Sequence, residues 1–273
     1  MERSGLMSQE YARRQEHEVA GWQVTVILVL PMVVGCFSVY TYKLTADEQA
    51  LLLSVAFLAM GLLSSTALAV SHRRSISLAA SGVAVVNALS LFIILVPRSG
   101  FVYADVLILF VATVGVLLLH RRFAELPSIG ASRLRESSVA AVLFLPMGLA
   151  VAQSLFLGLR FWESYPIGKT SLLFIPLLAV WGFAEEGLFR GVLQRSAYPL
   201  LGGGGSIILT AVLSSAFALF WGSLPYAIFS FLFGLLMGYM YLRSRSLMYV
   251  GTIHALMDTW MVISYLFLGI VIP

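Results

Sequence analysis

Five ionisable residues stand out because they lie inside long apolar stretches of the sequence, in two groups: Glu185, Glu186 and Arg190, then His254 and Asp258. A charged side chain near the centre of a membrane helix costs about 2.5 to 3.5 kcal/mol on insertion scales. Residues retained at such a cost usually have a function. These five residues are therefore the candidate catalytic site.

Both groups have the spacing of neighbours on one helical face. His254 and Asp258 are four residues apart, so the imidazole can hydrogen-bond the Asp through one nitrogen and present the other to substrate or water. Glu186 and Arg190 have the same spacing and can form a charge-assisted pair. Glu185 points about 100° away from its neighbour, so its carboxylate is available as a general base.

The composition places these residues in a membrane, because 60% of the 273 residues are hydrophobic, 11% are charged and the mean hydropathy is +0.94. A spanning helix needs about 20 apolar residues. The sequence therefore predicts an all-α, polytopic transmembrane bundle of eight or nine spans. The candidate spans are residues 20–42, 50–70, 76–96, 101–119, 139–159, 171–191, 205–221, 225–242 and 248–272.

The longest polar stretch after the N-terminus divides the chain. We expect a four-span N-terminal module at 1–120, a basic cytoplasmic loop at 121–138 and a catalytic core at 139–273. Asp105, in the fourth candidate span, is expected near the outer interface. The four glycines at 202–205 are expected to form a turn between the sixth and seventh spans.

Positively charged loops stay cytoplasmic, and with a cytoplasmic N-terminus 13 of the 17 Lys and Arg residues fall on the inner side. This predicts a multi-pass protein of the plasma (inner) membrane, with the Glu pair toward its cytoplasmic side. The first apolar segment is too long for a signal-peptide core, so we expect it to be retained. Topology signals and lipid headgroup contacts explain the net charge of +4, so no nucleic-acid partner is predicted.

Two motifs carry a resemblance to a known family. Glu-Glu-Gly-Leu-Phe-Arg-Gly at 185–191 resembles the Glu-Glu-x-x-x-Arg motif of the CPBP family, which contains CAAX proteases and bacteriocin-processing enzymes. Gly-Thr-Ile-His-Ala-Leu-Met-Asp at 251–258 resembles its late His-x-x-x-Asn/Asp motif. The resemblance covers about residues 170–265 and implies a glutamic-type intramembrane endopeptidase. Its expected partners are membrane lipids and a membrane-embedded or lipidated protein substrate.

The same resemblance assigns roles to the five residues. It implies that Glu185 deprotonates a water molecule and later protonates the leaving amine. It implies that His254 and Asp258 form or support the oxyanion site. Glu186 and Arg190 would hold the first helix of the site in place. No cofactor is expected.

The sequence departs from the family at its middle motif, Phe-x-x-x-His. Here Phe217 begins the motif and Trp221 stands where the histidine should be, so both are expected at the wall of the site. An indole has one N–H donor and no basic lone pair, so Trp221 cannot accept a proton. The alternative function is therefore a catalytically impaired protein of this fold that binds a hydrophobic peptide, in an immunity or scaffold role.

Other functions fit the sequence less well. A zinc site of Glu185, His254 and Asp258 would lack the short two-ligand motif typical of zinc hydrolases, so no metal is expected. Proton-coupled transport predicts paired halves with broken helices, whereas the buried ionisable groups occur in one half. The single cysteine, Cys36, excludes an intramolecular disulfide.

Overall fold

The computed structural model describes residue 23 and residues 26–69, 74–95, 136–157, 171–221 and 223–268. Within these residues the regular structure is helical, without strands. The helices are an unlabelled first helix Val26–Thr45, α2 Glu48–Ala69, α3 Arg74–Leu95, α5 Glu136–Leu157, α7 Ser171–Glu186, the π-helix η1 Gly187–Gln194, α8 Arg195–Ala218, the 3₁₀ turn η2 Leu219–Trp221, α9 Leu224–Ser244 and α10 Leu247–Leu268.

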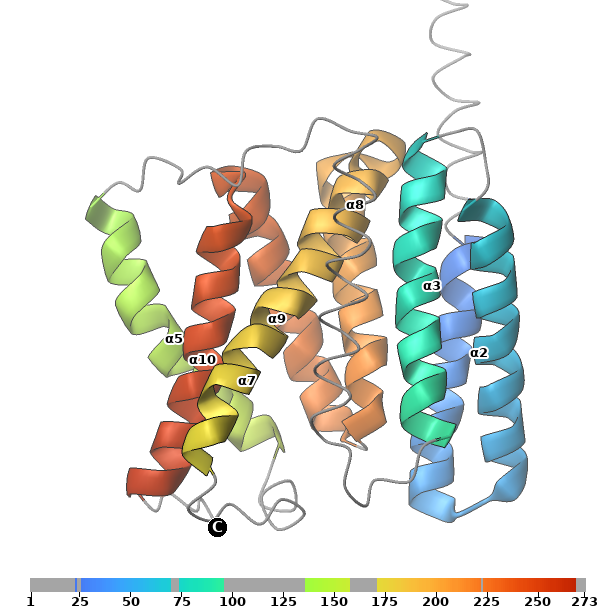
Figure 1. The fold of residues 1–273 in the computed structure, drawn as a ribbon, viewed down its shortest axis with the longest axis horizontal. Helices are drawn as coiled ribbons and strands as arrows, with labels where there is room; N and C mark the ends of the chain where they lie inside the picture. Colours follow the sequence, from blue (N-terminus) through green and yellow to red (C-terminus); the bar gives the residue numbers. More distant parts are fainter. Residues whose placement is uncertain are drawn as a thin grey trace, which may run out of the picture.

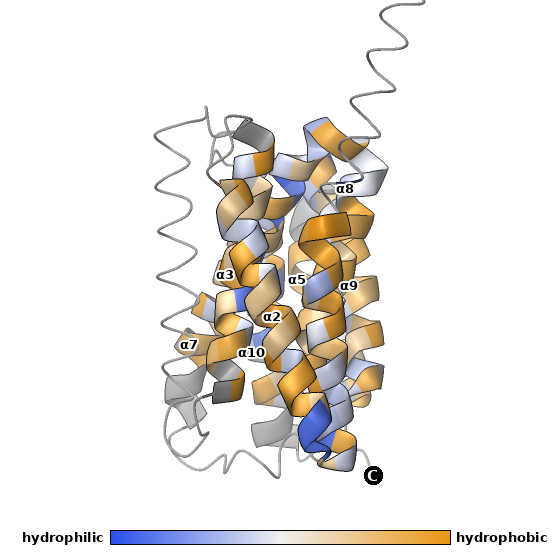
Figure 2. Ribbon diagram, turned by 90° about the vertical axis from the view of Figure 1, so that its right-hand side faces the viewer, coloured by the Kyte–Doolittle hydropathy of each residue, from blue (hydrophilic) through white to orange (hydrophobic). Residues whose placement is uncertain are grey.

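Several helices are apolar enough to lie in lipid, and the ribbons in Figure 2 are hydrophobic over most of their length. Four helical segments of the described residues are long and apolar enough to cross a membrane: Val26–Thr45, Glu48–Ala69, Ile175–Ala218 and Leu224–Ser244. Large apolar side chains lie exposed on the outside of the helices; Leu63, for example, is 72% exposed. Because exposing so many large apolar side chains to water is unfavourable, the chain is an integral membrane protein.

The predicted count of eight or nine spans is not confirmed. Helices α3 and α5 coincide with predicted spans, but their apolar parts, Ala79–Phe92 and Val142–Phe156, are shorter than a full membrane crossing. The predicted span 101–119, with Asp105, lies outside the described residues, as does most of the basic loop 121–138.

The helices form two neighbouring groups that meet along the middle of the molecule (Figure 1). The first helix, α2 and α3 stand together on one side, and α3 packs against α8 and η1. On the other side α10 packs against both α5 and α7, and α9 packs against α8. The five candidate residues lie on α7, η1 and α10, in the second group and at its border with the first.

The predicted turn at the four glycines coincides with a break in α8. At Gly202, where φ is 69° and ψ is −176°, the backbone is not helical, and two helical stretches meet there. This positive φ suits glycine, which has no Cβ to clash with the backbone. Residues from both sides of the break lie against the same partners. A Cβ on Gly238 of α9 would lie 3.0 Å from Ile207 and 3.3 Å from Gln194, and Phe217 stacks on Trp181 of α7. Because a straight helix rises about 1.5 Å per residue, these contacts require the chain to reverse direction near Gly202, as the predicted turn between the sixth and seventh spans does.

Candidate active site

Glu186 lies at the centre of a buried polar cluster. Its Oε2 lies 3.2 Å from Nε of Arg190, and its Oε1 lies 3.0 Å from Nδ1 of His254. Glu186 and Arg190 are each only 1% exposed. The predicted pairing of Glu186 with Arg190 is therefore present. The same carboxylate also joins α7 to α10 through the histidine.

The predicted hydrogen bond between His254 and Asp258 is not formed. His254 Nε2 lies 3.7 Å from Asp258 Oδ2, beyond hydrogen-bonding distance. The hydrogen bond of this imidazole instead goes from Nδ1 to Glu186 on the facing helix. Since a carboxylate only accepts, Nδ1 must carry the proton, so Glu186 fixes the tautomer that Asp258 was expected to fix.

Glu185 is held separately from its neighbour. Its Oε1 accepts a hydrogen bond of 2.7 Å from the indole Nε1 of Trp181, one helical turn earlier. Its Oε2 lies 3.7 Å from Nε2 of His254. The Glu185 side chain is 18% exposed, whereas that of Glu186 is 2% exposed. Of the two glutamates, Glu185 is thus the more accessible.

A π-helix begins directly after the two glutamates. All eight residues of η1, Gly187–Gln194, are buried, and the segment carries Arg190. Turns of π-helix are rare and occur frequently at functional sites, because the wider turn re-aims the side chains around it. No pattern in the sequence predicted this element.

Two glycines let α7 and α10 approach closely at the site. A Cβ on Gly182 would lie 3.1 Å from the backbone nitrogen of Ala255 and 3.3 Å from Cδ2 of His254. A Cβ on Gly251 would collide with the ring of Phe183. Small residues at such crossings allow membrane helices to pack backbone to backbone. This approach brings His254 within reach of both glutamates.

Three further residues of the site were missed from the sequence. Gln153 of α5 donates a hydrogen bond of 3.3 Å from Nε2 to Oδ1 of Asp258. The Tyr226 side chain of α9 lies near Asp258 and Glu185. The Phe233 ring packs edge-on against the His254 imidazole, with ring centroids 4.8 Å apart. A polar or aromatic residue in an apolar helix is a weak signal, because most such residues only pack.

Phe217, predicted at the site wall, packs against the residue that holds Glu185. Its ring stacks on Trp181, the donor to Glu185, with centroids 6.5 Å apart. The ammonium group of Lys43 donates a hydrogen bond to the backbone carbonyl of Phe220, which joins the first helix to η2. The Trp221 side chain lies outside the described residues, so its place at the wall stays a prediction.

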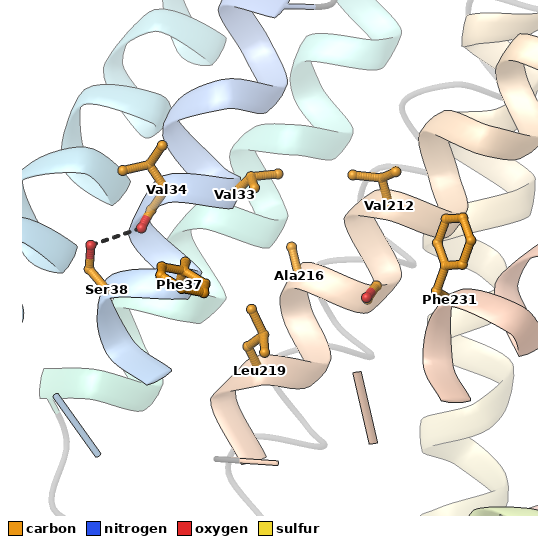
Figure 3. Close-up of a pocket in the computed structure, with 9 residues that line it drawn as sticks. Val33, Val34, Phe37, Ser38, Val212, Ala216, Leu219 and Phe231 are labelled. Carbon is orange, nitrogen blue, oxygen red and sulfur yellow. Dashed lines mark hydrogen bonds between the residues drawn. The ribbon is translucent and has the colours of Figure 1, made fainter. Parts of the chain in front are cut away.

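An apolar groove of about 360 Å³ lies between the first helix, α8 and α9 (Figure 3). Val33, Phe37, Val212 and Phe231 contribute to its lining. The hydroxyl groups of its two serines bond to backbone carbonyls of their own or a neighbouring helix. The groove contains none of the five ionisable residues, so it is separate from the polar cluster.

The arrangement of carboxylates, imidazole and guanidinium suits proton transfer in a dry environment. Among the described residues, no group of three or more His, Cys, Asp or Glu is arranged to hold a metal ion. A mechanism without metal nevertheless stays a prediction.

Comparison with known proteins confirms the resemblance that the two motifs indicate. Residues 167–260 match the family model described as Type II CAAX prenyl endopeptidase Rce1-like. The matched segment contains all five candidate residues, whereas α5 with Gln153 lies before it. No curated protein and no solved structure matches the chain.

Proposed function

We propose that this protein is an intramembrane endopeptidase that cleaves a membrane-associated or lipidated polypeptide with a water molecule activated by Glu185. The convergence of Glu185 Oε2 and Asp258 Oδ2 on His254 Nε2, each at 3.7 Å, is the observation that supports it most strongly. Each separation is too long for a direct hydrogen bond, yet one water at about 2.8 Å from both Glu185 and His254 fits beside the pair.

In this proposal Glu185 acts first as base and then as acid. Its carboxylate takes a proton from the water while the water oxygen attacks the scissile carbonyl carbon. The carbonyl oxygen becomes an oxyanion, which the Nε2–H of doubly protonated His254 stabilises. Glu185 then passes its proton to the amide nitrogen as the C–N bond breaks. The products are a carboxylic acid and an amine, and Glu185 returns to its starting state.

The surrounding residues hold these groups in place. Glu186 accepts from Nδ1 of His254, which directs Nε2 toward the substrate side. Arg190 balances the charge of Glu186. The Trp181 indole restrains one oxygen of Glu185 and leaves the other facing His254. Rigid positioning of this kind accounts for a large part of enzymatic rate enhancement.

The proposal extends to the rest of the chain. Residues 1–120 form a scaffold module, 121–138 a cytoplasmic loop and 139–273 the protease core. The N-terminus lies in the cytoplasm and the protein resides in the plasma (inner) membrane, as the distribution of Lys and Arg favours. The site then opens toward the cytoplasmic half of the bilayer, where a lipidated polypeptide tail would reach it.

One observation favours the alternative function, a binding protein of the same fold that has lost catalysis. Trp221 occupies the position of the middle-motif histidine, and His254 supplies the one imidazole of the described cluster. Such a protein would use the cluster to hold a hydrophobic peptide in an immunity or scaffold role. It would not cleave the peptide.

Terminal-peptide proteomics distinguishes the two functions. Host membranes containing wild type, Glu185→Gln or Glu48→Gln at matched levels are compared for cleavages in or beside hydrophobic segments. Glu48 is an exposed glutamate at the start of α2 and serves as the control. Cleavages present with wild type and Glu48→Gln but absent with Glu185→Gln support the protease. Identical peptide profiles in all three samples would favour the binding protein.

A further inference from the structure

Asp258 has a partner on a helix that contributes neither motif. Gln153, near the C-terminal end of α5, is 3% exposed, and its Nε2 lies 3.3 Å from Asp258 Oδ1. Helix α5 precedes the segment 167–260 that matches the family model. The contact therefore adds a residue from outside the matched segment to the candidate site.

The geometry divides the Asp258 carboxylate between two neighbours. Oδ1 accepts from Gln153, while Oδ2 is the oxygen 3.7 Å from His254 Nε2. Without a donor at Oδ1 the carboxylate is free to rotate about its Cβ–Cγ bond, since this torsion is broad. A hydrogen bond to one oxygen thus sets the direction of the other. A neutral amide does so without supplying a counter-charge that would compete with His254.

The other end of the Gln153 amide is also informative. Its Oε1 has no hydrogen-bond partner within the described part of the chain, although the atom is buried. The Tyr226 side chain lies beside Gln153 and near Asp258 and Glu185. A buried acceptor without a partner costs about 1 to 3 kcal/mol. A buried glutamine with its acceptor end unpaired and its donor end bonded to Asp258 points to a role for the donor end.

We propose that Gln153 is a positioning residue of the active site, which orients the Asp258 carboxylate toward His254. The inference rests on the proposed protease function and names a residue of that site from outside the matched segment. Gln153 acts through Asp258 and does not itself touch the reacting atoms. Its loss is expected to slow the chemical step and to leave substrate affinity nearly unchanged.

The test measures kcat and KM in proteoliposomes, with the peptide that wild-type membranes cleave as substrate. Gln153→Met removes the donor at similar side-chain length, and it is expected to lower kcat about tenfold with KM changed less than twofold. Ser154→Ala on the same helix is the matched control, because its hydroxyl bonds to the α5 backbone. The control is expected to retain wild-type kcat.

A double-mutant comparison separates positioning from a general structural role. Adding Gln153→Met to the Asp258→Asn variant is expected to lower its kcat less than threefold, because the carboxylate that Gln153 orients is already gone. If Gln153→Met is unstable in detergent, Gln153→Asn replaces it. The shorter side chain withdraws the donor by about one bond length, roughly 1.5 Å, and is expected to give the same pattern.

Each result decides between the possibilities. The positioning role would be overturned if Gln153→Met lowered kcat tenfold both with Asp258 and with Asp258→Asn, or if the Gln153 variants kept wild-type kcat. Either result would leave the protease function intact. A wild-type protein that cleaves no peptide would overturn the proposed function, and the inference with it. A kcat that falls when Gln153 is replaced in the protein with Asp258, but not in the Asp258→Asn variant, supports the positioning role and the protease function.

Discussion

Replacing Glu186 by glutamine tests the buried centre of the cluster. Glu186→Gln keeps the side-chain shape and an oxygen that can accept from His254 Nδ1. It removes the negative charge next to Arg190, which is 1% exposed and lies 3.2 Å away. Arg190 Nη1 has no hydrogen-bond partner among the residues that the structure describes. The substitution therefore leaves an arginine charge buried without its counter-charge.

The expected cost follows from that burial. Breaking a buried ion pair by removing one partner destabilises a protein by about 3 to 5 kcal/mol, because the remaining charge stays desolvated. At roughly 2 to 4 °C per kcal/mol, this corresponds to a fall in melting temperature of roughly 6 to 20 °C. Removing both charges, with Arg190→Met added to Glu186→Gln, is expected to recover most of the loss.

Thermal unfolding of the purified protein in one detergent measures these differences. The exposed Glu48→Gln is the control and is expected to change the unfolding free energy by less than about 0.5 kcal/mol. A loss below about 1 kcal/mol for Glu186→Gln would refute the reasoning. So would a double variant that is less stable than Glu186→Gln alone, since the arginine charge would then not be the cause.

Three further substitutions are expected to change activity or stability. Gly251→Ala is expected to lower stability and proteolysis, because its Cβ would collide with Phe183; Gly148→Ala on α5, where a Cβ meets no atom within 4 Å, should retain both. Trp181→Phe keeps a ring against Phe217 but removes the donor to Glu185, so kcat should fall about tenfold at unchanged melting temperature; an unchanged kcat would show that the hydrogen bond is dispensable. Trp221→His should raise turnover, since an imidazole can accept a proton and an indole cannot; equal or lower turnover would place this position outside the reaction.

The local part of the site was predictable from the sequence. Glu186 and Arg190 pair as their spacing of four residues predicts, because one helical turn brings them together whatever surrounds them. The same rule failed for His254 and Asp258. There the imidazole bonds across to Glu186, and this choice depends on how closely α7 and α10 approach at their glycines. Spacing along one helix holds no information about that distance.

The remaining differences have similar physical causes. Gln153 lies 105 residues before its partner, and a single amide among apolar residues has no periodic signature. The glycines at 202–205, by contrast, marked the break correctly, because Gly202 takes the positive φ at which the two helical stretches of α8 meet. Trp181 offered a usable signal that was missed, since it lies one turn before Glu185 on the same face.

The most direct test of the account is the rate at which purified protein in liposomes cleaves its identified peptide, with and without the Glu185 carboxylate. Glu185→Gln keeps an acceptor for Trp181 and cannot take a proton from water. Loss of a general acid–base group typically costs 10²- to 10⁴-fold, so kcat is expected to fall at least about 100-fold at unchanged melting temperature. A variant that cleaves within tenfold of wild type would contradict the central claim that Glu185 activates the water.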